Sequence, residues 1–242
     1  MNTIKIDSRQ TRMIAHRGLS GIERENTNPA FVAAGNRSYF GIETDVHKTA
    51  DGQFVIIHDE TTRRVSEEAV DVNVEENPYD RVKDLVLPDL DGSRVRQDIR
   101  IPLLTDYIKI CKKYEKVGVL ELKNRFEGED LLKIVEIIRK ENYLDQVIFI
   151  SFVPENCIFL REKLPEQRIQ LLLAAEVTEE IRAMLSEYRL DLDIYHERVN
   201  RELVDSLHKA GVKINCWTCD NKEQAEALVD MGVDFITSNI LE

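Results

Sequence analysis

The sequence has no long apolar run and has few basic residues relative to its acids. No apolar stretch approaches the roughly 20 residues that cross a bilayer as a helix, and the start, MNTIKIDSRQTR, lacks the apolar core of a secretory signal. Lys and Arg number 33 against 45 Asp and Glu, a formal net charge of −12. This balance disfavours nucleic acid or an anionic membrane surface as a partner, because both need a basic face. It still allows a local basic pocket for one phosphate.

Cysteine is scarce as well. The four cysteines, at positions 111, 157, 216 and 219, fit a reducing cytoplasm better than a disulfide framework, so we expect a cytoplasmic protein. Cys216 and Cys219 belong to a CWTC motif inside a β-prone run. Residues three apart in a strand point to opposite faces, so we interpret the pair as packing residues rather than a redox or metal site.

The remainder of the sequence has the composition of a globular protein with a sizeable core, at 43% hydrophobic and 32% charged residues. From about residue 117, short apolar strands alternate with amphipathic helical stretches. Asn200 and Asn221 stand where helices begin, and Gly211 and Gly232 where helices end. This alternation predicts repeated βαβ units and a parallel sheet.

Eight strands are predicted along the chain. They cover residues 13–16, 42–46, 117–123, 146–152, 169–174, 192–197, 212–218 and 233–238. Eight βα units close into a TIM (β/α)8 barrel, so we expect residues 1–242 to form a single barrel domain. The charged, aperiodic segment at about 60–100 predicts a small insertion over the barrel mouth, the alternative being a long surface loop.

One stretch, IETDVHKTADGQFVIIHD at residues 42–59, predicts a hairpin that rises past the barrel. If the Asp51-Gly52 turn pairs residues whose numbers sum to about 103, Asp45 lies opposite His58. FVIIH is then a returning ribbon rather than a barrel strand. The hairpin would bring an imidazole beside carboxylates at the barrel rim.

Polar side chains gather where the predicted strands end, the face on which barrel enzymes carry their active sites. Alternation puts Glu43 with Asp45 on one face of a strand, and Glu121 with Lys123 on one face of the next. Three converging carboxylates repel one another unless a cation lies between them. Hard oxygen ligands suit Mg²⁺ or Ca²⁺ rather than zinc.

Each of these signals also has an ordinary explanation. A lone Glu-x-Asp at a strand end is usually solvated, and a lone histidine is usually structural. Barrel interiors, however, are normally filled by branched apolar side chains, so inward acids are unusual. The joint occurrence of these groups at successive strand ends favours a functional site. His196 also ends a strand; a place at the barrel mouth is the alternative, but a structural role is the preferred interpretation.

The motifs IAHRG, ENT, IETDVHKTADGQFVIIHD, IPLL, LELK, ISF and WT occur in the order and at the spacing of the glycerophosphodiester phosphodiesterase family. The chain resembles this family from His16 to about residue 238. The resemblance implies a TIM barrel with a small insertion and one bound divalent cation. The residues that it implies are Glu43, Asp45 and Glu121 for the metal, His16 and His58 for acid–base catalysis, and Arg17, Lys123 and Trp217 for phosphate and substrate binding.

The expected activity is metal-dependent hydrolysis of a small-molecule glycerophosphodiester to sn-glycerol 3-phosphate and an alcohol. The chain has TSN at residues 237–239 where the family commonly has TD-x-P, a difference that bears on alcohol specificity. A lysophospholipase D or sphingomyelinase D-like lyase is the first alternative, but its acylated substrate needs an apolar mouth and the 60–100 segment is charged. A non-catalytic binding barrel is the second, although such a protein is expected to lose a histidine or a metal acid.

Overall fold

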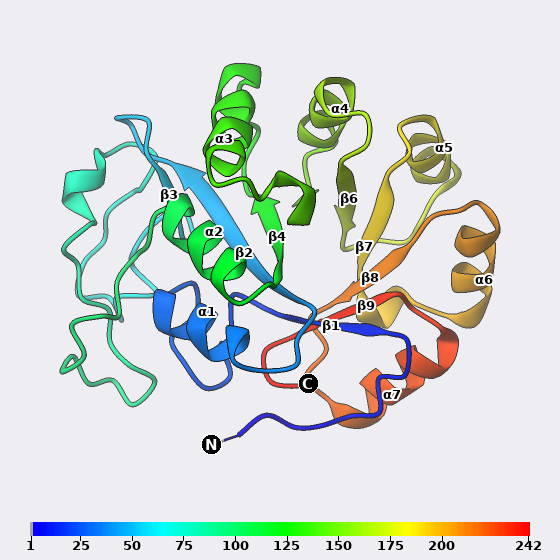
Figure 1. Cartoon of the computed structure of the whole chain (residues 1–242), viewed down its shortest axis with the longest axis horizontal. Helices are drawn as coiled ribbons and strands as arrows, with labels where there is room; N and C mark the ends of the chain where they lie inside the picture. Colours follow the sequence, from blue (N-terminus) through cyan, green and yellow to red (C-terminus); the bar gives the residue numbers. More distant parts are fainter. Residues whose placement is uncertain (1) are drawn as a thin grey trace.

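In the computed structural model, which describes residues 2–242, eight parallel strands close into a barrel with helices on its outside (Figure 1). The sheet closes because β1 pairs with both β9 and β2. The barrel strands are β1 (Arg12–Ala15), β2 (Gly41–Lys48), β4 (Val117–Leu122), β5 (Val147–Ser151), β6 (Arg168–Leu173), β7 (Asp191–Tyr195), β8 (Ile214–Trp217) and β9 (Phe235–Ser238). The predicted TIM barrel is confirmed.

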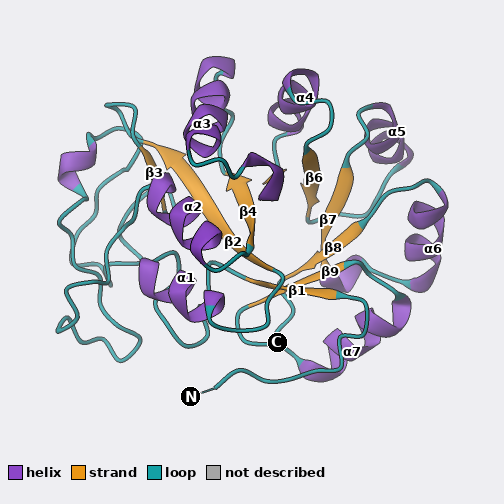
Figure 2. Ribbon diagram, viewed as in Figure 1, coloured by secondary structure: helices purple, strands orange, loops and turns teal. Residues whose placement is uncertain are grey.

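Helices follow the barrel strands and cover the outer face of the sheet (Figure 2). They are α1 (Asn28–Gly35), α2 (Leu104–Lys113), α3 (Gly128–Lys140), α4 (Pro154–Lys163), α5 (Glu179–Glu187), α6 (Arg201–Lys209) and α7 (Lys222–Met231), with short 3-10 turns η2 (Leu144–Gln146) and η3 (His196–Arg198). Asn200 and Asn221 cap α6 and α7 with their side-chain oxygens, as predicted. Gly232 ends α7 at a φ of 87°. None of the helices within residues 2–242 combines the length and apolarity needed to cross a membrane.

Helix α2 was not anticipated from the sequence. Its buried side chains, Leu104, Tyr107, Ile108 and Cys111, follow the three- and four-residue spacing of one helix face. The Tyr107 hydroxyl donates to the Ile42 carbonyl at 2.7 Å and so fixes the helix against β2. The pattern is short and directly follows the aperiodic 60–100 segment, which hid its period.

Strand β3 (Phe54–Ile56) pairs antiparallel with β2 and lies outside the closed barrel. The interpretation of FVIIH as a returning ribbon is therefore confirmed. The predicted pairing of Asp45 with His58 is wrong by one residue, because the backbone N–H of Ile57 donates to the Asp45 carbonyl at 3.1 Å.

The length of the hairpin loop explains this shift in register. Thr49 donates its N–H to the Gln53 carbonyl at 2.8 Å, which leaves three residues in the loop, and Gly52 supplies the left-handed conformation at a φ of 80°. An odd-numbered loop moves the pairing by one residue relative to the even-numbered loop that the sum of 103 assumes. Because β3 ends at Ile56, strand alternation does not set the direction of His58.

Residues 57–103 extend beyond β3, on the left in Figure 1, and include the 3-10 turn η1 (Tyr79–Arg81). Together with Val55 of β3 they form a small apolar core, separate from the core between the barrel and its helices. That small core consists of Val55, Ile57, Val65, Val72, Val74, Val82, Leu87, Ile99 and Ile101. Since Val55 and Ile57 come from the hairpin, this core ties the charged segment to β2 and the barrel rim.

Apolar side chains also fill part of the barrel interior. They are Ile14, Val117, Val119, Ile148, Ile150, Leu172 and Phe235. Polar side chains replace them toward the C-terminal ends of β2 and β4. The first and last described segments of the chain lie side by side, because Ile4 donates its N–H to the Ile240 carbonyl at 3.1 Å.

Candidate active site

Three carboxylates lie together inside the barrel. Glu43 and Asp45 come from β2 and Glu121 from β4, and the strand register places Asp45 directly beside Glu121. One carboxylate oxygen from each residue lies within 4.8 Å of the other two, and all three side chains are buried. The predicted convergence of these acids is what the strand register produces. Such a cluster of hard oxygen donors could hold a divalent cation.

Two cationic side chains face this cluster. Lys123 Nζ lies 2.8 Å from Glu121 Oε1 and 3.5 Å from Asp45 Oδ1. Arg17 Nε lies 3.5 Å from Asp45 Oδ2. Neither Asp45 Oδ1 nor Glu121 Oε1 makes a hydrogen bond of acceptable geometry, although both atoms are fully buried. Lys123 and Arg17 therefore neutralise the cluster only in part.

The three acids differ in how readily they ionise. Burial, and then the charges of Asp45 and Glu121, raises the pKa of Glu43 well above its usual range. Burial opposes ionisation of Asp45 too, but Arg17 and Lys123 outweigh it and hold the pKa of that carboxyl well below its usual range. Burial and the Asp45 charge raise the pKa of Glu121 to about 7. Without a further cation, at least one of the three carboxyls therefore keeps its proton at neutral pH.

The loop between β1 and α1 places Arg17 against these acids. Arg17 has a φ of 52°, and in that conformation its backbone N–H donates to Glu43 Oε2 at 2.8 Å. Gly18 follows at a φ of 76° and donates its N–H to the Glu43 carbonyl at 3.1 Å. A Cβ on Gly18 would lie 2.7 Å from the Ala30 backbone in α1, so glycine is needed on two grounds. The HRG motif thus holds Glu43 by side chain and backbone.

His16 lies at the end of β1, with its Nδ1 2.8 Å from Asn239 Oδ1. The Asn239 amide is oriented by Asp220, whose carboxylate accepts a hydrogen bond from Asn239 Nδ2 at 2.5 Å. The Asn239 oxygen therefore faces the imidazole, and His16 must donate from Nδ1. Burial, and then the Arg17 charge, lowers the pKa of His16 to about 4. At neutral pH the ring is uncharged, with an unprotonated Nε2 3.9 Å from Glu43 Oε2.

His58 has a carboxylate partner instead of an amide. Its Nδ1 lies 2.7 Å from Asp59 Oδ1, and His47 Nε2 lies 3.1 Å from its backbone carbonyl oxygen. The His58 side chain is 32% exposed. Burial lowers the pKa of His58, and the positive charges of Arg17 and Lys123 act in the same direction, whereas Asp45 and Asp59 oppose them. Both imidazoles line the same cavity despite the one-residue shift in the hairpin.

This cavity has a volume of about 100 Å³ and lies at the C-terminal ends of the barrel strands. Its lining includes His16, Arg17, Glu43, His58, Glu121, Lys123, Asp193 and Trp217. Trp217 ends β8, donates Nε1–H to the Asp193 carbonyl, and packs edge-on against Phe152 with the ring centroids 5.5 Å apart. Phe152 is 42% exposed and also lines the cavity, so aromatic side chains form part of its wall.

Several supporting residues were missed by the sequence analysis. Asn26, from the ENT motif, donates to Asp45 Oδ2 at 2.7 Å, and Thr44 fixes its orientation by donating to Asn26 Oδ1. The residue type was a signal for Asn26, because asparagine tolerates the left-handed backbone conformation that Asn26 adopts at a φ of 54°. Asn239 and Asp193 gave no such signal. Asp193 is buried, its Oδ1 makes no hydrogen bond, and burial raises its pKa well above the usual range.

Other candidates lie apart from this cavity. His196, in η3, packs against the Tyr195 ring and is not among the cavity-lining residues. Cys216 and Cys219 are buried and unbridged. A larger surface depression of about 680 Å³ lies near Arg139 and Arg168, at the N-terminal ends of β5 and β6, and contains none of the predicted site residues.

The chain is similar to known proteins over most of its length. The profile of the glycerophosphoryl diester phosphodiesterase family matches residues 16–241. A glycerophosphodiester phosphodiesterase of Caldanaerobacter subterraneus is 30% identical over 241 residues, covering 95% of this chain and 94% of that protein. Another, of Bacillus altitudinis, is 28% identical over 242 residues and covers 93% of each chain.

A solved structure has the same fold. A phosphodiesterase of Oleispira antarctica, in complex with the product sn-glycerol-3-phosphate, superposes with a TM-score of 0.87 at 25% identity, covering 98% of this chain and 96% of that one. The family match spans most of the chain and includes the cavity described above. On these grounds the chain belongs to the glycerophosphoryl diester phosphodiesterase family.

Proposed function

We propose that this protein hydrolyses glycerophosphodiesters to sn-glycerol 3-phosphate and an alcohol, using one divalent cation and two histidines. The observation that carries the proposal is the single cavity in which two imidazoles, a carboxylate cluster and two cationic side chains converge. That combination supplies acid–base catalysis and charge neutralisation at one phosphate, which are the two needs of diester cleavage. The family to which the chain belongs supports the substrate class.

Glu43, Asp45 and Glu121 are the residues that would hold the cation. The fit rests on the donor set and on the buried oxygens Asp45 Oδ1 and Glu121 Oε1, which lie near Lys123 but make no hydrogen bond of acceptable geometry. Carboxylate oxygens suit Mg²⁺ or Ca²⁺. When bound, such an ion neutralises negative charge on the nonbridging oxygens of the phosphate. It also offsets the burial and the Asp45 charge that together raise the pKa of Glu121 to about 7.

Arg17 and Lys123 are proposed to bind the phosphate. Both are cations on the cavity wall, and both remain charged because the nearby acids outweigh the effect of burial and raise the pKa values of the two groups. Trp217, which also lines the cavity, is proposed to contact the departing alcohol or the glycerol carbons with its ring. A positively charged alcohol such as choline gains from that face.

The two histidines are proposed to act as a pair. His16 is neutral with a free Nε2, so it accepts the proton of the attacking oxygen as that oxygen forms a bond to phosphorus. Burial lowers the pKa of His58, but Asp59 favours its charged form, so the protonated form of His58 gives a proton to the alcohol oxygen as its bond to phosphorus breaks. With the neighbouring glycerol hydroxyl as attacker, the first product is a cyclic phosphate. Water then opens the ring with the two roles reversed, which restores both protonation states.

The test is a turnover assay with Mg²⁺ or Ca²⁺ in excess, using glycerophosphocholine, glycerophosphoethanolamine and lysophosphatidylcholine as substrates. Released choline and sn-glycerol 3-phosphate are measured separately, and a double variant, His16→Ala with His58→Ala, controls for contaminating enzymes. We expect sn-glycerol 3-phosphate from the first two substrates. Choline released from lysophosphatidylcholine alone would identify a lysophospholipase D instead. No turnover of any substrate with either cation would identify a binding barrel.

A further inference from the structure

The guanidinium of Arg64 joins two carboxylates from different parts of the chain. Its Nε lies 2.6 Å from Asp59 Oδ2 and its Nη2 lies 3.1 Å from Asp59 Oδ1. Its Nη1 lies 2.9 Å from Glu25 Oε2 and its Nη2 2.8 Å from Glu25 Oε1. All three guanidinium nitrogens are thus used, and each carboxylate is held through both of its oxygens. Asp59 belongs to the segment after β3, and Glu25 to the loop between β1 and α1.

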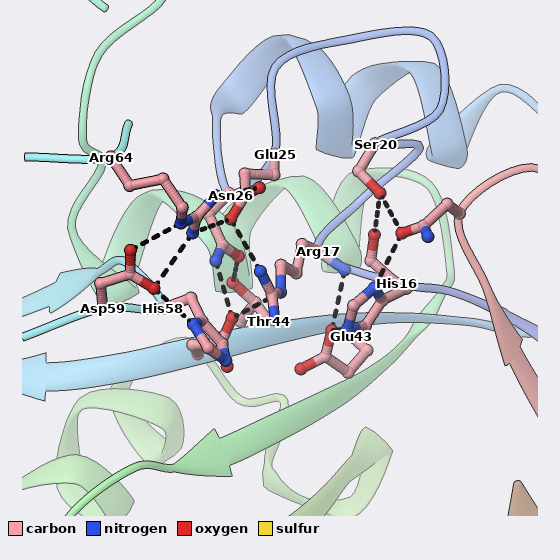
Figure 3. A network of polar contacts seen from close by, with 12 residues as sticks. His16, Arg17, Ser20, Glu25, Asn26, Glu43, Thr44, His58, Asp59 and Arg64 are labelled. Carbon is pink, nitrogen blue, oxygen red and sulfur yellow. Dashed lines mark hydrogen bonds and ion pairs between the residues drawn. The ribbon is translucent and has the colours of Figure 1, made fainter. Parts of the chain in front are cut away.

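Each of these carboxylates also contacts a side chain at the cavity. Asp59 Oδ1 lies 2.7 Å from His58 Nδ1, and Glu25 Oε1 accepts from Arg17 Nη1 at 2.9 Å. Figure 3 shows the resulting chain of polar contacts, which runs from His58 through Asp59, Arg64 and Glu25 to Arg17. Arg64, which lies outside the cavity, is therefore linked to the His58 imidazole and to the Arg17 guanidinium inside it. Arg64 itself is not among the cavity-lining residues.

The ion pairs of Arg64 with Glu25 and Asp59 are stabilised by the charges of all three groups. Burial opposes ionisation of Glu25 and Asp59, yet hydrogen bonds from Arg64 help to lower both of their pKa values to about 2. The Glu25 side chain is 17% exposed, so solvent screens the pairs less than it would on an open surface. Without Arg64, Glu25 would be left with Arg17 as its only ion-pair partner in the network, and Asp59 would keep only His58.

We propose that Arg64 is a positioning residue for catalysis, which holds His58 and Arg17 in a fixed relative position through Asp59 and Glu25. The proposal rests on the function proposed above, because it assigns Arg64 to the imidazole that protonates the leaving group and to the guanidinium that binds phosphate. The segment beyond β3 thereby contributes to the site without reaching the substrate. Lysine cannot replace Arg64, since a single ammonium does not reproduce the planar fork that engages two carboxylates at once.

The test compares Arg64→Ala and Arg64→Lys with a matched control, Arg63→Ala. Arg63 is the adjacent arginine, and its exposed side chain lies 3.4 Å from Glu68, a contact outside the network. We expect both Arg64 variants to lose roughly 10- to 100-fold in kcat/KM while their unfolding transitions stay close to that of the wild type. The Arg63 variant should keep full activity. Wild-type activity in both Arg64 variants would overturn the proposal.

Two further measurements separate positioning from a purely structural role. In a His58→Ala background, Arg64→Ala should cost a smaller factor than in the wild type, because part of its effect passes through the missing imidazole. The same factor in both backgrounds would contradict the proposal. By NMR, the His58 ring signals should move in Arg64→Ala and stay in place in Arg63→Ala. This second measurement needs no turnover, so unchanged His58 signals would overturn the proposal even if the assay of the proposed function failed.

Discussion

At the residue scale, the two imidazoles differ in the group that each Nδ1 meets. His16 faces the amide oxygen of Asn239, a neutral acceptor, whereas His58 faces the carboxylate of Asp59. A carboxylate partner stabilises an imidazolium more than an amide does. The structure therefore supports the order of roles in which His16 is the base and His58 the acid of the first step.

Replacing each histidine with alanine tests that order. On glycerophosphocholine, both variants should lose roughly 10²–10⁴-fold in turnover. On bis(p-nitrophenyl) phosphate, whose leaving group departs without a proton, His58→Ala should recover much of its loss and His16→Ala should not. Parallel losses on both diesters would show that the two imidazoles do not divide the work in this way.

The burial of His16 also predicts a pH dependence of stability. Its pKa is about 4 in the folded protein against 6.5 in the unfolded chain, so the unfolded chain binds the extra proton between these values. Stability from this group is present above pH 6.5 and is lost as the pH falls through 4. The loss amounts to roughly 3 kcal/mol at about 1.4 kcal/mol per pH unit. Urea unfolding of wild type and His16→Gln in chelator, from pH 7 to pH 4, should show the gap between them changing by that amount. Parallel curves would contradict it.

Residue patterns predicted the acids of the site better than their supports. Glu43, Asp45 and Glu121 could be placed because strand alternation and the barrel rule fix which side chains point inward. Asn239 and Arg64 could not be placed, because they lie in segments whose path depends on tertiary packing. No periodic pattern in the sequence says which loop atom meets His16 or Asp59.

At the element scale, the count of strands was predictable and the details of the hairpin were not. Eight strands followed from the alternation of apolar and helical stretches, and β3 was correctly kept out of the barrel. The predicted register of the hairpin was wrong by one residue, because three-residue loops and even-numbered loops share the same Asp-Gly signal. Helix α2 was not predicted for a different reason. Its ten residues carry a single buried stripe, which lies next to an aperiodic segment of the sequence.

The β1–α1 loop provides an element-scale prediction. Gly18→Ala should lower the free energy of unfolding by about 2–4 kcal/mol, because it combines a left-handed backbone with a Cβ that overlaps α1 at 2.7 Å. Gly211→Ala is the matched control, since Gly211 has a φ of 78° and open space around its Cβ position. It should cost only about 1 kcal/mol. Equal losses in urea unfolding would show that the approach of α1 does not constrain position 18.

At the scale of the whole molecule, the excess of acidic residues extends into the interior of the barrel. The chain carries a net charge of −12, and three of its acids are buried side by side within the closed sheet. Among residues 2–242, the cationic side chains that compensate them directly are Arg17 and Lys123. The fold therefore contains a site whose repulsion a divalent cation would relieve, so binding of the cation should be linked to the stability of the whole barrel.

This linkage gives a prediction with a defined pH dependence. Mg²⁺ or Ca²⁺ at about 100 times its dissociation constant should stabilise the protein by about 2.7 kcal/mol at pH 8. At pH 6 the Glu121 carboxyl, with a pKa of about 7, keeps its proton, and displacing it should weaken binding about tenfold, or about 1.4 kcal/mol. Urea unfolding at matched ionic strength, with and without the cation, measures both values.

Glu121→Gln should reduce the stabilisation and flatten its pH dependence, whereas Glu129→Gln, which replaces an exposed acid on α3, should change neither. A cation effect equal in all three proteins would mean that the ion acts elsewhere than at the buried carboxylates.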